Sequence, residues 1–314
     1  MERSDTVAVI DVGSNSIKLL VARAAGASVE TVFTHTIETR ISEGISEAVP
    51  ELDDSAMAAG VATIFELYEE ALGYSPVEMQ IGATSAVRDA INGMDFAMMV
   101  MAATGIEMRV LSGEEEATYI GRGIACDPAL KGVGSFIQMD IGGGSLELIR
   151  FDGGEIQKAI SLQLGAVRLT EMLVPDKQVP LSVEKAEAIR VHVISALERS
   201  GFDFNPKDWP MVATGGAFVI SRSMLAAKQG LKTEESPAVL TKDMLRELFT
   251  KISLMPLVER ITVPGLPVAR ADIAPTALVT ILAVLEYAGR EEISHSFYNL
   301  RYGMAAAMLG VSGR

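Results

Sequence analysis

Alternation of apolar and polar positions predicts short strands and longer helices along the chain. Two β-rich runs, Thr6–Ile10 and Ile17–Ala22, flank the turn-forming cluster DVGSNS and predict a hairpin at the start. Val29–Thr39 predicts a third strand. Apolar residues at helical spacing in Ser55–Ala71, ended by Gly73, predict the helix that follows. Strands and helices then alternate, which is typical of an α/β fold.

The same opening pattern begins again near the middle of the chain. Phe136–Ile141 and Leu146–Phe151 predict a second hairpin about the sequence GGGS, and Glu155–Leu162 predicts a strand after it. The pattern therefore predicts two domains, residues 1–125 and 126–314, and leaves open that the last helix packs back on the first domain. Further helices are predicted at Ala166–Leu173, Val183–Ser200, Lys242–Lys251, Pro256–Ile261, Asp272–Tyr287 and Tyr302–Leu309.

Four methionines are concentrated in Met94–Met101, within the predicted helix Asp95–Thr104. Methionine is flexible and fills irregular gaps in protein cores. We therefore interpret these side chains as core filling rather than as a binding surface.

Composition narrows the class of protein. With 314 residues, 49% of them hydrophobic and 22% charged, the chain suits two globular domains. A net charge of −14 disfavours nucleic acid and anionic membrane as partners. The longest apolar helical stretch, Ile273–Leu285, is too short to span a membrane.

The cysteine and histidine content excludes further classes. Cys126 is the single cysteine, so neither an intrachain disulfide nor a cysteine zinc cluster can form. This, with no signal-peptide pattern at the N-terminus, leads us to expect a cytoplasmic protein. His35, His192 and His295 are widely separated and do not predict a metal site.

The two hairpin turns share one motif, Asp-x-Gly-x-x-Ser. Laying D-V-G-S-N-S-I-K-L-L over D-I-G-G-G-S-L-E-L-I aligns Asp11 with Asp140, and the offset stays at 129 residues throughout. One such turn alone is an ordinary hairpin loop. Two copies, one near the start of each predicted domain, predict related lobes whose loops bind phosphate across a cleft.

The residue types in this motif suit an anion and a metal ion. Glycine allows a tight turn, and backbone N–H groups with the hydroxyls of Ser14, Ser16 and Ser145 can donate to phosphate oxygens. Asp11 and Asp140 stand at strand ends just before the loops, where carboxylates would hold a hydrated Mg²⁺. We therefore expect Mg²⁺, or another divalent cation, as cofactor.

Seven motifs in order resemble a single family over nearly the whole chain. The family is that of the exopolyphosphatases and guanosine pentaphosphate phosphohydrolases. The resemblance implies a duplicated α/β fold of the actin, Hsp70 and hexokinase (ribonuclease H-like) type, whose two lobes bind a phosphate chain in the cleft between them for cleavage by water. The motifs are AVIDVGSNSIKLLVA from Ala8, TRISEGI from Thr39, GATSAVRDAIN from Gly82, VLSGEEEA from Val110, MDIGGGSLEL from Met139, SLQLGAVRLTE from Ser161 and ATGGA from Ala213.

The resemblance also implies roles for individual residues. Arg88 matches the family's substrate-binding arginine, and arginine can hold a phosphate with two parallel hydrogen bonds. Glu116 matches the glutamate that activates or orients the attacking water, with Glu115 as the second candidate and Glu114 as part of an acidic helix turn. The two phosphate loops correspond to Asp11, Gly13, Ser14, Asn15 and Ser16, and to Asp140, Gly142, Gly143, Gly144 and Ser145.

Several matches have two interpretations. Glu147 matches a glutamate that follows the second loop, and it either contacts the metal or points outward from its strand. Thr214 and Gly215, followed by Gly216, resemble a glycine turn that handles the nucleoside end of a ligand, or one that only closes the second lobe. Arg23 and Arg40 could supply positive charge around a longer phosphate chain, and Lys18 lies in the hairpin strand.

The resemblance favours one activity among several. We expect an exopolyphosphatase-like phosphohydrolase that releases terminal phosphate from inorganic polyphosphate by Mg²⁺-assisted attack of water. Guanosine pentaphosphate is the alternative substrate, and the sequence does not separate the two. Two further functions fit the same loops: a catalytically silent sensor of nucleotide or polyphosphate, and a sugar or acetate kinase. A homodimer is a further possibility. Members of the family often carry an additional helical C-terminal region with a His-Asp metal motif. The sequence up to Arg314 does not contain that motif, so we expect low processivity on long polyphosphate chains.

Overall fold

The computed structural model describes residues 6–43, 45–47, 49–153 and 155–311, which fall into two compact units. The first unit contains Met1–Gly134, Phe151–Ser161 and Phe297–Arg314, and the second contains Ser135–Arg150 and Leu162–Ser296. The units therefore differ from a single division after residue 125. Residues 151–161 and the C-terminal segment group with the first unit.

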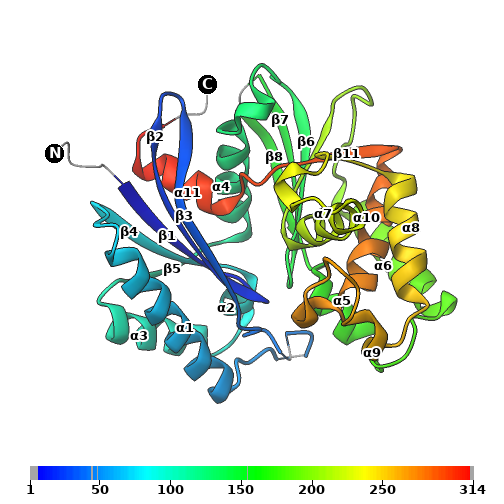
Figure 1. The fold of residues 1–314 in the computed structure, drawn as a ribbon, viewed down its shortest axis with the longest axis horizontal. Coiled ribbons are helices and arrows are strands. Elements are labelled where there is room, and N and C mark those ends of the chain that lie inside the picture. Colours follow the sequence, from blue (N-terminus) through cyan, green and yellow to red (C-terminus); the bar gives the residue numbers. More distant parts are fainter. Residues whose placement is uncertain (1–5, 44, 48, 154, 312–314) are drawn as a thin grey trace. The chain divides into compact units, whose positions relative to one another are not determined.

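A five-stranded sheet forms the centre of the first unit, in the order β3-β2-β1-β4-β5 (Figure 1). The central strand β1 is buried at every residue, because helices cover both faces of the sheet. It pairs antiparallel with β2, as the predicted hairpin requires, and parallel with β4. The strands are β1 (Thr6–Val12), β2 (Ser16–Ala25), β3 (Ser28–Glu38), β4 (Glu78–Ala83) and β5 (Met108–Val110).

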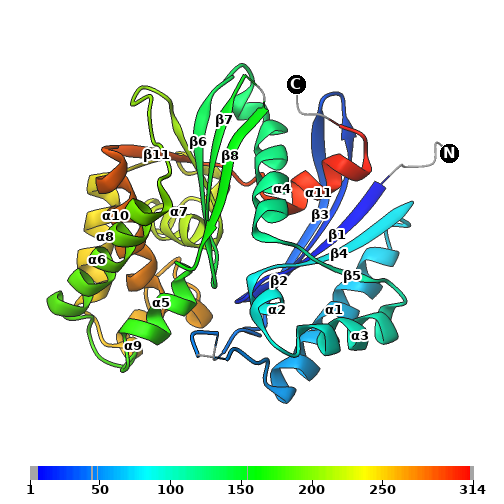
Figure 2. The same cartoon turned by 180° about the vertical axis from the view of Figure 1, so that it is seen from behind.

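Helices lie on both faces of this sheet. Figures 1 and 2 show α1 and α3 on one face and α11 on the other, where α11 packs against α4 and β1. The predicted helix after the third strand is confirmed as α1, which Asp53 caps through the amide of Ser55. The helices of the first unit are α1 (Asp54–Leu72), α2 (Ser85–Asp89), α3 (Gly93–Thr104), α4 (Gly113–Ala125) and α11 (Leu300–Met308).

The interpretation of the methionines in α3 as core filling is wrong. Met94 and Met98 are 67% and 61% exposed, and Met99 and Met101 are also exposed. The helix buries Phe96, Ala97, Val100 and Thr104 instead. Residues at this spacing share one helix face, so the methionines fall on the outer side.

A second sheet repeats the strand order of the first. Most of its strands lie in the second unit, whereas the end of β7 and nearly all of β8 fall in residues 151–161, which group with the first unit. The order is β10-β11-β9-β6-β7-β8, so that β8, β7, β6, β9 and β11 correspond to β3, β2, β1, β4 and β5, and β10 is an added edge strand. The central strand β6 is buried at every residue, like β1, and pairs parallel with β9. The strands are β6 (Phe136–Ile141), β7 (Leu146–Asp152), β8 (Glu155–Leu162), β9 (Met211–Thr214), β10 (Val239–Thr241) and β11 (Glu292–His295).

The helices of the second unit pack around α10, the most apolar of them. α10 contacts α5, α6, α7 and α8 and buries 12 of its 15 residues. None of the helices in the described ranges is long and apolar enough to cross a membrane. The helices are α5 (Ala166–Leu173), α6 (Val183–Ser200), α7 (Gly216–Gln229), α8 (Lys242–Ser253), α9 (Leu257–Arg260) and α10 (Ala274–Ala288).

Among the α-helices and strands of the described residues, the sequence pattern did not predict α2, α7, β10 and β11. α2 has only five residues, and α7 begins at the second glycine of the pair Gly215-Gly216, a dipeptide that is typical of a turn. β10 and β11 have three and four residues, too few for a period-2 pattern to stand out.

Candidate active site

The first candidate loop lies between β1 and β2 and presents backbone N–H groups. The amide of Gly13 donates to the carbonyl of Ser16 at 3.1 Å and closes the turn. The carbonyl of Ser14 accepts from the amide of Ser42, and that of Asn15 accepts from the amides of Thr39 and Arg40. Within residues 6–43, 45–47, 49–153 and 155–311, the amides of Ser14 and Asn15 donate to no protein group. Such a turn is an anion-binding concavity.

Side chains from other segments fix this loop in place. The hydroxyl oxygens of Ser14 and Ser85 lie 3.1 Å apart, which ties the loop to α2. Asn15 Nδ2 donates to Glu38 Oε2 at 2.5 Å, and Arg40 Nε donates to Asn15 Oδ1 at 3.4 Å. The loop is therefore supported on its carbonyl side by the 38–42 segment.

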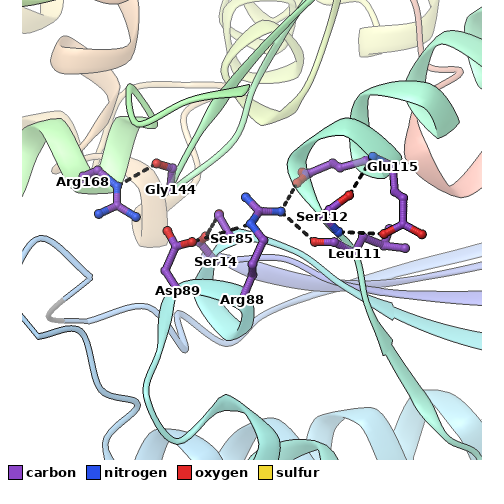
Figure 3. A network of polar contacts seen from close by, with 10 residues as sticks. Ser14, Ser85, Arg88, Asp89, Leu111, Ser112, Glu115, Gly144 and Arg168 are labelled. Atoms are coloured by element: carbon purple, nitrogen blue, oxygen red, sulfur yellow. Dashed lines mark hydrogen bonds and ion pairs between the residues drawn. The ribbon is translucent and has the colours of Figure 1, made fainter. Parts of the chain in front are cut away.

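Arg88 and Glu116, the predicted substrate and catalytic residues, lie side by side in the first unit. Arg88 Nη1 donates to Glu116 Oε2 at 2.9 Å and to the carbonyl of Leu111 at 2.9 Å (Figure 3). Arg88 Nε lies 3.6 Å from Asp89 Oδ1, the ion pair expected if Arg88 had no role in binding. Glu116 is 7% exposed, whereas Arg88 is only partly buried and keeps an open side.

Glu115, the second catalytic candidate, has a different environment. Its carboxylate accepts from the amide of Ser112 at 2.9 Å, while its own amide donates to the Ser112 hydroxyl, which forms a capping box (Figure 3). Arg109 Nη2 donates to the other carboxylate oxygen at 2.6 Å. The hydrogen bond from Ser112, followed by the one from Arg109, lowers the pKa of Glu115. Of the two glutamates, Glu116 is the one beside Arg88.

The second candidate loop, between β6 and β7, has the same hydrogen bonding as the first. The amide of Gly142 donates to the carbonyl of Ser145 at 3.0 Å. The carbonyls of Gly142, Gly143 and Gly144 accept from amides at the start of α5, residues 165–168. In the part of the chain that the structure describes, the amides of Gly143 and Gly144 donate to no protein group. Each loop therefore leaves two successive backbone N–H groups available to an anion.

Asp140 is held by the turn at the end of β9. The Thr214 hydroxyl donates to Asp140 Oδ2 and accepts from Gln138 Nε2 at 2.9 Å. Gly215 has φ +98°, and a Cβ there would lie 2.6 Å from Asp140 Oδ1 and from the carbonyl of Ile141. Only glycine fits this close approach to the carboxylate.

Comparison with known proteins identifies the family. A sequence model described as the Ppx/GppA phosphatase family matches residues 20–311. The chain belongs to this family. The resemblance inferred from the seven motifs is thus confirmed, and membership of a phosphatase family supports phosphohydrolase activity.

Solved structures of Ppx/GppA proteins share the fold. An exopolyphosphatase from Cytophaga hutchinsonii is 22% identical, with a TM-score of 0.86 over 98% of this chain and 99% of that one. The Aquifex aeolicus family member is 23% identical, with a TM-score of 0.78 over 97% and 98% of the two chains. An exopolyphosphatase-like protein gives a TM-score of 0.87 at 22% identity, over 96% and 97%. The predicted duplicated α/β fold is confirmed.

Arg23 lies away from the first loop of this Ppx/GppA protein. It forms a bidentate ion pair with its cross-strand neighbour Glu30, with both hydrogen bonds at 2.9 Å. Arg23 pairs with Thr6 at one end of the hairpin, whereas Ile17 pairs with Val12 at the loop end. Six residues of strand separate the two ends, about 20 Å. The structure does not bring Arg23 to the phosphate loop.

The two copies differ at one position beside the shared aspartate. Lys18 is the cross-strand partner of Asp11, with Nζ 3.9 Å from Oδ2. The constant offset of 129 residues places Glu147 at the position equivalent to Lys18, beside Asp140. Glu147 is buried in β7 and does not point into solvent. The first copy thus pairs a carboxylate with an ammonium group, and the second has two carboxylates.

Two arginines near the second loop were not singled out from the sequence. Arg168 in α5 is buried, and its Nε donates to the carbonyl of Gly144 at 2.9 Å (Figure 3). Arg270 is also buried, and its guanidinium fills the space that a Cβ on Gly216 would need. Arg168 lies within the quoted motif SLQLGAVRLTE, but nothing local distinguishes it from a surface arginine.

Proposed function

We propose that the protein is an exopolyphosphatase-like phosphohydrolase that releases terminal phosphate from inorganic polyphosphate. The observation that carries this proposal is the pair of equivalent turns, in which carbonyls are engaged and N–H groups are available. Backbone amides bind phosphate without a lysine or arginine at every oxygen. Binding by backbone amides suits a polyanionic substrate although the chain has a net charge of −14. The partial positive charge of the amides acts locally, at the two turns.

Arg88 and Glu116 would supply the chemistry beside the first loop. The guanidinium of Arg88 would bind equatorial oxygens of the terminal phosphate, where charge builds up during transfer. The carboxylate of Glu116 would accept a hydrogen bond from the attacking water and orient it towards phosphorus. A phosphate at Arg88 would compete with Glu116 for Nη1, so substrate binding and release of the carboxylate would be linked.

The donor set of the second unit fits the expected Mg²⁺. Asp140 and Glu147 are buried carboxylates at the positions that Asp11 and Lys18 occupy in the first copy. The second copy has no ammonium group at this position, so a cation would balance the two negative charges. No three His, Cys, Asp or Glu side chains cluster within the described ranges, and Mg²⁺ is commonly held by one or two carboxylates with waters and substrate phosphates. When bound, the ion would neutralise phosphate oxygens. Asp11, the third expected ligand, faces Lys18 and is the weaker candidate.

A phosphate-release assay tests the proposed function. The purified protein is incubated with Mg²⁺ and short polyphosphate, long polyphosphate or guanosine pentaphosphate, with EDTA as the control. Release from polyphosphate that EDTA abolishes supports the proposal. Release from guanosine pentaphosphate alone would reassign the substrate, and release from none would exclude a hydrolase of this kind. The three substrates share a terminal phosphoanhydride, so each arm differs only in what carries it.

A further inference from the structure

The C-terminal helix α11 covers the face of the first sheet to which Asp11 points. Asp11 and Gly82 are partners in the parallel pairing of β1 with β4, and register partners direct their side chains to the same face. A Cβ on Gly82 would lie 3.0 Å from the sulfur of Met304 in α11. Asp11 is therefore enclosed between the sheet and α11, and its side chain is 8% exposed.

Arg301 reaches the sheet on this same face. It precedes Met304 by three residues, so the two side chains share one side of α11. Arg301 Nη1 donates to the carbonyl of Leu19 at 3.0 Å, and the residue before Leu19, Lys18, is the cross-strand partner of Asp11. Burial lowers the pKa of the Arg301 guanidinium, and the negative charge of Asp11 opposes that shift. Lys18 and Arg301 thus lie around one buried carboxylate.

Close packing of two helices fixes where Arg301 stands. A Cβ on Gly303 of α11 would collide with the carbonyl of Tyr119 in α4, and a Cβ on Gly123 of α4 would collide with the carbonyl of Asn299, which caps α11. The backbones therefore touch with no side chain between them. α4 carries Glu116 in its first turn. The packing that fixes Arg301 in α11 therefore also supports the helix of the candidate catalytic glutamate.

We propose that Arg301 is a positioning residue that acts through Asp11. With Lys18 it neutralises the Asp11 carboxylate from inside the first unit and holds it below the first phosphate loop. Asp11 is then a structural anion of the loop, and the metal-binding carboxylates are those of the second copy. Of this proposal, only the expected effect of Arg301 on turnover rests on the proposed function. The electrostatic coupling between Arg301 and Asp11 can be tested without it.

A double-mutant cycle measures the coupling between Arg301 and Asp11. The variants are Arg301→Met, which keeps the apolar stem, Asp11→Asn, and the two together, each unfolded in urea. If Arg301 neutralises Asp11, the loss in the folding equilibrium constant of the double variant is smaller than the product of the two single losses by about fivefold or more. If the loss in the double variant equals the product of the two single losses, the proposal is overturned. Arg290→Met is the matched control, since Arg290 is a buried arginine that donates to the carbonyls of Phe204 and Pro206, and its loss should multiply with that of Asp11→Asn.

Turnover gives the second test. We expect Arg301→Met to lower kcat for phosphate release about tenfold or more, with a smaller change in KM, and Arg301→Lys to restore part of kcat. In the Asp11→Asn background, Arg301→Met should have little further effect on kcat. An Arg301→Met variant with wild-type kcat would overturn the catalytic part of the proposal. If the wild-type protein releases no phosphate, the proposed function fails, and the urea cycle alone decides the role of Arg301.

Discussion

Nη1 of Arg88 lies 2.9 Å from Oε2 of Glu116, although 28 residues separate them in the chain. The contact joins the short helix α2 to the first turn of α4 and brings the expected substrate and catalytic residues to one place. A guanidinium that already holds the carboxylate can exchange it for a phosphate, which is also negatively charged. The pair is therefore a charge-balanced site before substrate arrives.

Glu116→Gln should abolish most turnover while leaving substrate binding nearly intact. The amide keeps the size of the side chain but cannot orient water as a carboxylate does, so we expect kcat to fall about 10²–10⁴-fold. The measurement is phosphate release together with substrate binding by calorimetry. Glu115→Gln is the matched control, because Glu115 serves the capping box and Arg109. It should lower the melting temperature slightly and keep turnover, and the opposite pattern would exchange the two roles.

Arg88→Lys should weaken substrate binding although it conserves the charge. Lysine cannot form the planar two-bond contact with phosphate, so we expect KM to rise about tenfold, which corresponds to about 1.4 kcal/mol. Arg23→Lys provides the comparison, since Arg23 pairs with Glu30 at the far end of the hairpin. It should leave both kcat and KM unchanged. An equal effect of the two substitutions on KM would argue against a direct role for Arg88.

Gly215→Ala should disrupt the second site. The residue has φ +98°, and the new methyl carbon would meet Asp140 Oδ1 and the Ile141 carbonyl at 2.6 Å. Gly26→Ala is the control, because Gly26 also has positive φ, +64°, but has open space around it. The control should lose about 1 kcal/mol of unfolding free energy and no activity. Gly215→Ala should lose more stability and most phosphate release, and similar unfolding curves for the two would show that the predicted collision is relieved.

Unfolding free energy should decrease as the pH falls because of His295. Burial, and next the charge of Arg222, lower the pKa of His295 from 6.5 to about 3. Between these values the unfolded chain binds a proton that the native imidazole does not. The native state is therefore favoured above pH 6.5 and loses up to about 1.4 kcal/mol per pH unit below it. Urea unfolding of the wild type and His295→Gln at pH 7 and 5 measures the difference, and equal pH dependence in both would contradict this account.

The sequence alone determined the local elements and the duplication. The hairpin turns at Gly13–Ser16 and Gly142–Ser145 follow from glycine and serine flanked by apolar runs, and the constant offset of 129 residues related them. The matching order of β3-β2-β1-β4-β5 and β8-β7-β6-β9-β11 agrees with that relation. Period and turn chemistry are short-range properties, so they can be inferred without knowing what packs against them.

Tertiary structure decided which face of each element is covered and which distant residues meet. The methionines of α3 face outward because the opposite side of the helix, with Phe96 and Val100, is buried, and the Phe96 ring packs against Gly60 of α1. Neighbours in SGEEEA differ for the same reason, since the turn of α4 directs Glu116 to Arg88 and leaves Glu115 at the helix cap. Arg301 reaches the Leu19 carbonyl across 282 residues, a contact that no local pattern encodes. The type of a residue limits the chemistry of its side chain, and long-range packing determines which partner that side chain contacts.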